Sequence, residues 1–402
     1  MNTTGIPTRH NATVGAMAAR VRQFAATHTP FRVYHGSSNS TRRSDRHEDN
    51  IIDTSKLDQV LRVDPVRKTA LVEPNVSMDK LIDITAHYGL VPRVVMGVPG
   101  ITVGGGFSGT SWESSSFKWG PFDATVNWIE IILPDGTVQM ASKTEKPDLF
   151  WGAASAFGTM GIVTLLEVQL MNAKRYVELT YRREGDFGQV VETLLDQTAL
   201  GTSNDYVDAI VFAKDSTLIC TGQLTDALPR GAVPQRFLRA RDPWFYIHAE
   251  RIEKQLRRSP PNTKLRDYVP LVDYLFRYDR GSFWTARYVF QYFLTPLNRY
   301  TRFVLDPLVR TRVASRTLHH SGLHDTHIVQ DVGIPVPRAE EFVEWVDANL
   351  HIYPLWLCPV FVRRLERNSQ YGLHADFGAP DGPDMYLNFG IWGPASSSQG
   401  DA

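Results

Sequence analysis

The chain has 402 residues, of which 43% are hydrophobic and 21% are charged, and its formal net charge at pH 7 is zero. This length predicts two domains, and the composition is that of an ordinary soluble globular protein. Because duplex nucleic acids are bound mainly through an excess of lysine and arginine, the balanced charge argues against a nucleic-acid partner. The two cysteines, Cys220 and Cys358, lie far apart without the spacing of metal ligands, so neither a disulfide framework nor a metal site is expected.

No stretch of the sequence has the character of a targeting or membrane-spanning segment. The N-terminal residues lack an apolar core of signal-peptide length, and no run of about 18 apolar residues occurs. We therefore expect a cytoplasmic protein. Peripheral association with the endoplasmic reticulum membrane is a second option, which depends on an arginine-rich segment described below.

The first 172 residues alternate between short helices and short strands, which is an α+β pattern. The expected elements are a helix over 14–27, a strand ending at Gly36, short strands broken by Pro65 and Pro74, a helix over 78–90, strands within 127–136 and 135–140, a helix from Asp148 and a strand over 162–170. A glycine-rich segment over 101–120 precedes the later strands. We assign residues 1–172 to one domain.

From Arg175 onward the pattern predicts a second domain that again mixes strands and helices. The expected elements are strands over 176–183, 208–214 and 216–226, an aromatic-rich helical zone from Pro243 to about Arg316, the segment 327–335, a helix over 339–350 and a strand over 351–362. Small polar residues predict a disordered tail over 394–402. Residues 173–393 are therefore assigned to a substrate domain.

The glycine-rich segment, ITVGGGFSGTSWESSSFKWG, offers backbone N–H groups and hydroxyls to an anion such as a pyrophosphate. It contains no Walker sequence of the form G-x-x-x-x-G-K-[ST]. Gly104, Gly106 and Gly109 match G-x-G-x-x-G, but they do not directly follow a first strand as a Rossmann unit requires. Taken alone, the segment is equally consistent with a glycine-rich hairpin that binds nothing.

Three separated segments together resemble the PCMH-type FAD-binding domain of the vanillyl-alcohol-oxidase superfamily. They are HGSSNST at 35–41, the glycine-rich segment at 99–120 and FGTMGIV at 157–163. Within that superfamily the chain resembles the delta-24-sterol reductases, through TVGG, GT-x-x-ESSS-x-K-x-G, PDGT, DLFW, GTMG, FWTARYVF, HIVQD and HIYPLWLCP. The resemblance implies an α+β fold, in which a PCMH-type domain of two subdomains is followed by an α+β cap domain that is incomplete at its C-terminus.

The resemblance also implies which residues contact FAD. They are Gly36, Ser37, Ser38, Asn39 and Ser40 in the first segment, Thr102, Val103, Gly104, Gly105, Gly106, Phe107, Ser108, Gly109, Thr110, Ser111, Trp112, Glu113, Ser114 and Lys118 in the second, and Gly158, Gly161 and Ile162 in the third. For Glu113 and Lys118, a structural ion pair is as good an interpretation as a flavin contact. Asn39 stands where many oxidases of the superfamily carry the histidine that binds flavin covalently, so non-covalent FAD is expected.

The activity implied by the resemblance is an FAD-dependent oxidoreductase of sterol biosynthesis. NADPH would reduce the flavin, and the reduced flavin would deliver hydride to a carbon–carbon double bond of a sterol-like substrate. Two alternatives stay open: an FAD-linked oxidase of an alcohol or secondary metabolite that uses oxygen, and a non-catalytic flavin-binding remnant. The flavin-binding remnant is suggested because the resemblance ends near residues 387–394, whereas the sequences of family members continue beyond this point.

Reduction of an isolated double bond requires a proton donor and an apolar cavity. The titratable candidates are Tyr274, Arg277, Asp279, Arg280, His327, His351 and Tyr353. Each is better interpreted as a structural residue, so no catalytic residue is assigned, and the oligomeric state is not indicated. Residues 286–316 carry six arginines against Asp306. This excess of arginine predicts either a solvated helix face or a surface that rests on a membrane, and we favour the solvated face.

Overall fold

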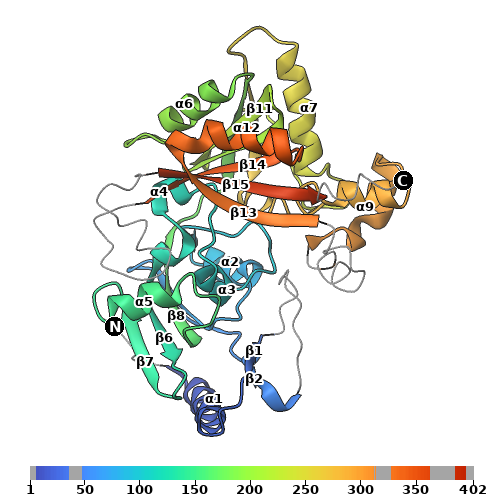
Figure 1. Cartoon of the computed structure of the whole chain (residues 1–402). Coiled ribbons are helices and arrows are strands. Elements are labelled where there is room, and N and C mark those ends of the chain that lie inside the picture. Colours follow the sequence, from blue (N-terminus) through green and yellow to red (C-terminus); the bar gives the residue numbers. More distant parts are fainter. Residues whose placement is uncertain (1–5, 36–47, 312, 314–326, 363–384, 395–402) are drawn as a thin grey trace.

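The computed structural model describes residues 6–35, 48–311, 313, 327–362 and 385–394. It confirms an α+β fold that is built on two large antiparallel sheets (Figure 1). One continuous hydrophobic core contains buried residues of both sheets, from Ala70 and Val72 in the first to Trp356 and Cys358 in the second. The two sheets are therefore packed through a shared interior.

The first sheet is formed by residues 60–172. Its strands are ordered β3 (Val60–Asp64), β4 (Thr69–Val72), β8 (Ile162–Asn172), β6 (Val126–Ile132) and β7 (Val138–Ser142), and β5 (Leu90–Pro92) pairs with β8. Helices α2 (Met78–Ala86) and α5 (Pro147–Ala153) add buried side chains to the core. The short strands β1 (Arg32–Tyr34) and β2 (Ile51–Asp53), separated by η1 (Glu48–Asn50) in the part described, form a parallel pair.

Helix α1 (Thr8–Ala26) begins earlier than its apolar pattern predicts, but it buries the predicted face. Val14, Met17, Val21 and Phe24 recur at helical spacing and pack in one cluster with Ile132 of β6. The first turn of the helix carries His10, which is fully buried between two acidic side chains.

His10 links α1 to the first sheet through two hydrogen bonds. Its Nδ1 lies 2.9 Å from Glu73 Oε1, and its Nε2 lies 3.1 Å from Glu130 Oε1. Burial alone would lower the pKa of His10, but the hydrogen bonds and charges of Glu130 and Glu73 outweigh burial and raise the pKa to about 9. A protonated imidazole ring is therefore held between two carboxylates.

We expect His10→Gln to lower the free energy of unfolding by about 2 kcal/mol at pH 6. Because the folded-state pKa of His10 is raised, its stabilisation is complete below the ordinary value of 6.5 and is lost as pH rises through about 9. Urea unfolding at pH 6 and pH 10 measures the difference, with the exposed His28→Gln as the control. An equal loss at both pH values would contradict this account.

The second sheet has seven strands. Their order is β12 (Lys264–Pro270), β9 (Tyr176–Glu184), β11 (Ser216–Thr225), β10 (Tyr206–Ala213), β14 (Leu355–Phe361), β15 (Met385–Pro394) and β13 (His327–Pro335). Helices α6 (Phe187–Gln197) and α12 (Ala339–Asn349) cover one face, as Figure 1 shows. Helix α7 (Phe245–Arg257) packs beside β9, β11 and β12.

The alternation of side chains along β10 separates the two faces of this sheet. Val207 and Val211 pack in a cluster with Val343 of α12, whereas Tyr206 and Ile210 belong to the core that continues into the first sheet. Side chains on the second of these faces are therefore the ones that meet the first domain.

Three elements of the second domain differ from the sequence-based expectation. Strand β12 lies inside the zone that was predicted to be helical, and α6 and β15 were not predicted. The aromatic content of 243–316 suggested a helix, but Lys264–Pro270 is drawn into the sheet by its long-range pairing with β9. The rest of that zone does form helices, namely α7, α8 (Leu271–Leu275), α9 (Ala286–Tyr292), α10 (Arg299–Leu305) and η3 (Asp306–Leu308).

Candidate functional site

The glycine-rich segment begins with a short helix, α3 (Val103–Ser108), where a loop or hairpin was expected. Thr102 is the residue at its N-terminal cap, and its Oγ1 accepts a hydrogen bond from the N–H of Gly105 at 3.2 Å. A Cβ added to Gly104 would lie only 2.7 Å from Pro74 Cβ, whereas one added to Gly105 would meet only Thr102 Oγ1, at 3.1 Å. Gly104 thus serves the packing of the chain, and Gly105 is exposed and open to a ligand.

The third predicted segment lies directly against the second. The N–H of Phe157 donates to the Ser108 carbonyl at 3.0 Å, and the N–H of Ser155 donates to Thr110 Oγ1 at 3.2 Å. Phe157 and Met160 are exposed, and no atom lies within 4 Å of the position that a Cβ would take at Gly158. The two segments together form a surface of exposed glycine, half-exposed serine and exposed apolar groups.

Not every predicted contact residue faces this surface. Val103, Gly106, Phe107 and Thr110 are buried, and Ile162 is buried at the start of β8. Residues Gly36–Ser40 lie outside the described part of the chain, although the strands on either side of them are placed. Thr54, which directly follows β2, is connected to α3 by two hydrogen bonds. Asn75 donates to Thr54 Oγ1 at 3.0 Å, and the N–H of Val103 donates to the carbonyl of the adjacent Val76 at 2.9 Å.

The second half of the glycine-rich segment connects the two domains. The Ser114 carbonyl accepts the N–H of Val207 on β10 at 2.7 Å, and Lys118 forms an ion pair with Asp205 at 2.8 Å. The indole of Trp112 covers Gly333 of β13, where an added Cβ would lie 2.3 Å from Trp112 Cη2. Helix α4 (Ser116–Trp119) packs on β14 in the same region. Lys118 is therefore committed to a structural ion pair with the second domain.

Two carboxylates lie at this domain boundary, Glu113 of the glycine-rich segment and Asp331 of β13. Glu113 Oε1 accepts the N–H of Gly97 at 2.6 Å. Loss of hydration raises the pKa of Glu113 to about 8, against the lowering effects of the Gly97 hydrogen bond and the Arg277 charge. Asp331 contributes to the increase, because its negative charge acts on Glu113.

Asp331 lies on the face of β13 that meets the first domain, two residues before Gly333. It pairs in register with Gly390 of β15, where an added Cβ would lie 3.0 Å from Asp331 Oδ1. Loss of hydration raises the pKa of Asp331 to about 7, although a hydrogen bond from Asn388 opposes the increase. The side chain is nevertheless exposed to solvent.

The acid candidates chosen from sequence have structural roles. Arg277 forms a buried ion pair with Asp208 at 2.7 Å, and Arg280 forms one with Asp306 at 2.6 Å. The Tyr353 hydroxyl donates to Asp347 at 3.0 Å. Tyr274 is buried, Asp279 is buried, His351 is exposed, and the His327 ring lies 5.8 Å from that of Tyr288. Sequence reasoning missed Asp331, although the HIVQD motif that contains it was noticed.

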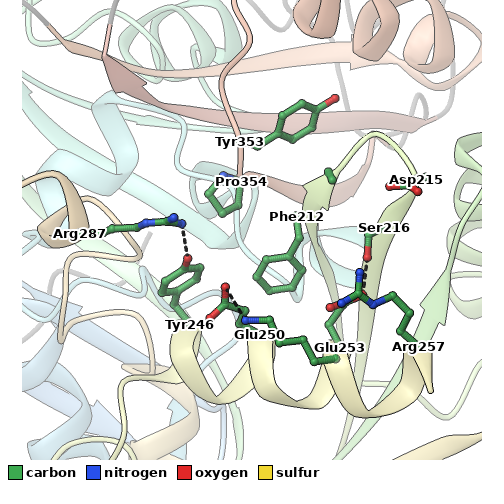
Figure 2. Close-up of a pocket in the computed structure, with 12 residues that line it drawn as sticks. Phe212, Asp215, Ser216, Tyr246, Glu250, Glu253, Arg257, Arg287, Tyr353 and Pro354 are labelled. Atoms are coloured by element: carbon green, nitrogen blue, oxygen red, sulfur yellow. Dashed lines mark hydrogen bonds and ion pairs between the residues drawn. The ribbon is translucent and has the colours of Figure 1, made fainter. Parts of the chain in front are cut away.

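A separate cavity of about 180 Å³ lies in the second domain between α7 and the β10–β11 hairpin (Figure 2). Its charged groups neutralise one another, since Glu250 pairs with Lys254 at 3.3 Å and Glu253 pairs with Arg183 at 3.2 Å. Arg287 donates to the Tyr246 hydroxyl at 3.0 Å. All of its lining residues lie between Phe212 and Pro354, so the predicted FAD segments do not reach it. Within the described ranges, no cluster of three metal-binding side chains occurs.

Comparison with known proteins supports the FAD assignment. Residues 11–142 match the family described as FAD binding domain. The chain is 28% identical to the Delta(24)-sterol reductase homolog dhcr-24 of Caenorhabditis elegans over 346 residues, 82% of this chain and 65% of that protein. It is 28% identical to the Delta(24)-sterol reductase of Pisum sativum over 362 residues, 85% of this chain and 63% of that protein.

A more distant similarity is confined to one part of the chain. Cytokinin dehydrogenase 5 of Oryza sativa subsp. japonica is 29% identical over 136 residues, 33% of this chain and 26% of that protein. The chain spans slightly less than two thirds of the length of the sterol reductases named above. These comparisons confirm the family resemblance that the sequence motifs predicted.

Proposed function

We propose that this chain, which carries a PCMH-type FAD-binding domain over residues 11–142 and is homologous to proteins named Delta(24)-sterol reductase, reduces a carbon–carbon double bond of a sterol-like molecule with electrons from NADPH. The chain is thus an FAD-dependent oxidoreductase. The observation that carries the finer proposal is the position of Asp331, an accessible carboxylate with a pKa of about 7 beside the FAD-binding segment.

The residues around α3 fit the diphosphate of FAD. Gly105 leaves room for close approach, and the half-exposed Ser108 and Ser111 offer hydroxyls beside it. Phe157 and Met160 offer an exposed apolar surface next to Ser108 for an aromatic ring system. When bound, FAD supplies the chemistry of hydride transfer, which the side chains of the protein lack. The protein then has to bind the cofactor and the substrate, hold them in the right orientation and supply a proton.

Asp331 is our candidate for the proton donor. Saturation of an isolated double bond adds one hydride to one carbon and one proton to the other, so the second carbon needs an acid. At pH 7 about half of a carboxyl group with a pKa of about 7 is protonated, whereas an ordinary aspartate is almost fully ionised. The Asp331 oxygen gives its proton to the alkene carbon and takes another from water, to which it is accessible.

Anaerobic stopped-flow absorbance of the flavin band tests the proposed reaction. We expect NADPH to bleach the band, and a sterol with a Δ24 double bond to restore it with formation of the saturated sterol. Failure of NADPH to bleach the flavin would overturn the reductase proposal. Rapid reoxidation by air with release of hydrogen peroxide would instead identify the oxidase, and bound FAD without turnover would identify the non-catalytic alternative.

We expect FAD to be bound without a covalent link, because Asn39 cannot form the bond that a histidine forms at this position in many oxidases. Precipitation of the purified protein with acid should therefore release yellow flavin into the supernatant. Absorbance of the supernatant and the pellet measures the partition. Flavin that remains with the precipitated protein after washing would contradict a non-covalent site.

A further inference from the structure

Exposed apolar side chains are concentrated in one short part of the second domain. Of the twenty large apolar residues that are exposed in the described ranges, nine lie between Tyr292 and Val313. We call this surface the apolar patch; it consists of Tyr292, Phe293, Leu294, Leu297, Tyr300, Phe303, Val304, Leu308 and Val313. Single exposed apolar residues are common, but so many of them in one short segment indicate an interaction surface.

The helices of the patch have little contact with the protein core. Helix α10 has no buried residue, and α9 buries only Ala286 and Phe290. These two side chains pack on Trp244 and Val309 in a small cluster of their own. Figure 1 shows α9 at the outer edge of the second domain, beyond the end of the large sheet. The segment is anchored on one side and presents its other side to the surroundings.

The charge of this segment is strongly positive. Arg287, Arg299, Arg302 and Arg310 lie within it, and Asp306 is the sole acidic residue in the sequence from 286 to 313. Asp306 is buried and already pairs with Arg280 at 2.6 Å and with Arg310 at 3.3 Å. Its charge is therefore not available to a partner. Of the four arginines only Arg310 pairs with it, so the surface combines apolar groups with a net positive charge.

We propose that the apolar patch binds the surface of a lipid bilayer that contains anionic phospholipids. Tyrosine, phenylalanine and leucine side chains enter the boundary between head groups and acyl chains, and neighbouring arginines bind the phosphates. Two-fold association of a second copy through the same patch is disfavoured, because both contacting surfaces would then carry the same excess of arginine over acidic residues. This inference does not depend on the reaction proposed above.

The membrane contact is of the peripheral kind. No helix among the described residues is long and apolar enough to cross a bilayer. Helices α9 and α10 have seven residues each, which is far shorter than the roughly 20 residues that span a bilayer. They can lie in the interface plane, as short amphipathic elements do.

Flotation of the full chain with vesicles tests the proposal. We expect the protein to float with vesicles of phosphatidylcholine and phosphatidylserine, and to float less with phosphatidylcholine alone or at high salt. The triple variant Leu294→Ser, Phe303→Ser and Val304→Asn should bind the mixed vesicles at least ~tenfold more weakly, because three apolar groups no longer leave water. All three side chains are exposed, so its melting temperature should match that of the parent.

A matched control and a charge variant sharpen the test. The double variant Leu200→Ser and Val233→Asn replaces apolar residues that are 93% and 87% exposed outside the patch, and it should bind like the parent. Arg299→Gln should weaken binding to mixed vesicles by about fivefold while leaving binding to phosphatidylcholine unchanged. A parent that does not float, or a triple variant that floats equally well, would overturn the proposal. A third outcome would also overturn it. If light scattering shows that the parent forms a dimer, and the triple variant loses the dimer but still floats, the patch binds a second copy of the chain.

Discussion

Replacement of Asp331 by asparagine is expected to slow reduction of the substrate double bond by about 100-fold or more, because general acids typically contribute 10² to 10⁴ to such steps. Reduction of the bound flavin by NADPH should keep its rate, since that half-reaction needs no proton for the alkene. Asparagine preserves the shape of the side chain beside Gly390 and Asn388, so its effect is on proton supply and not on packing.

Two further measurements separate a proton donor from a structural residue. In the parent protein the rate of alkene reduction should fall as pH rises through about 7, where Asp331 loses its proton, and Asp331→Asn should remove this dependence. Because folding raises the pKa of Asp331 from 3.8 to about 7, stability falls as pH rises between these two values, and the loss is complete above pH 7. Asp331→Asn should therefore be at least as stable as the parent at pH 8.

The control for this variant is Glu344→Gln, which removes an exposed carboxylate from α12 on the opposite face of the same sheet. It should leave both half-reactions unchanged. If Asp331→Asn reduces the double bond at the parental rate with the same pH profile, Asp331 is not the donor. In that case Glu113, whose pKa is raised to about 8 at the same boundary, becomes the carboxylate to replace.

Alanine at Gly104 should destabilise the fold, whereas alanine at the adjacent Gly105 should not. Gly104→Ala places a Cβ 2.7 Å from Pro74 Cβ and 3.1 Å from the Pro74 carbonyl oxygen, which also accepts the N–H of Gly104. A proline ring and a backbone group cannot rotate away. We expect a loss of about 1–3 kcal/mol in the free energy of unfolding, as overpacking typically causes.

Gly105→Ala should instead leave the stability of the flavin-free protein unchanged and weaken FAD binding by ~tenfold or more. Its Cβ would lie 3.1 Å from Thr102 Oγ1, so that hydroxyl has to shift slightly, and no other group outside the helix lies within 4 Å. The higher helix propensity of alanine offsets the cost of this shift, and the added methyl group obstructs the approach of a ligand. Thermal unfolding of flavin-free protein and titration with FAD followed by flavin fluorescence measure the two effects. If Gly105→Ala binds FAD as tightly as the parent, the diphosphate does not approach the chain at this position.

The cofactor could be predicted from sequence because the residues that we propose to contact it are consecutive. Thr102–Ser114 carries a recognisable order of glycines and hydroxyls, and the segment ending near Ile162 carries another. The hydrogen bond from the Phe157 N–H to the Ser108 carbonyl then confirms that the two segments are neighbours. What consecutive order does not reveal is which residues face inward, so the packing role of Gly104 appeared only with Pro74 beside it.

Asp331 could not be selected from sequence because its environment is assembled by long-range pairing. Its position opposite Gly390 depends on the register of β13 with β15, and β15 itself was not predicted. The same limit explains β12, because the pairing of residues 264–270 with β9 outweighs the local helical pattern.

The packing of the Trp112 ring on Gly333 couples the glycine-rich segment to β13. Trp112, whose ring lies against β13, is only ten positions after Thr102 at the cap of α3 and seven positions after Gly105. A ligand that fixes the backbone at Gly105 therefore restrains, through this short segment, the side chain that rests on β13. By reciprocity, any displacement of β13 alters the affinity of the loop for its ligand, so cofactor occupancy and the state of the substrate domain are thermodynamically linked.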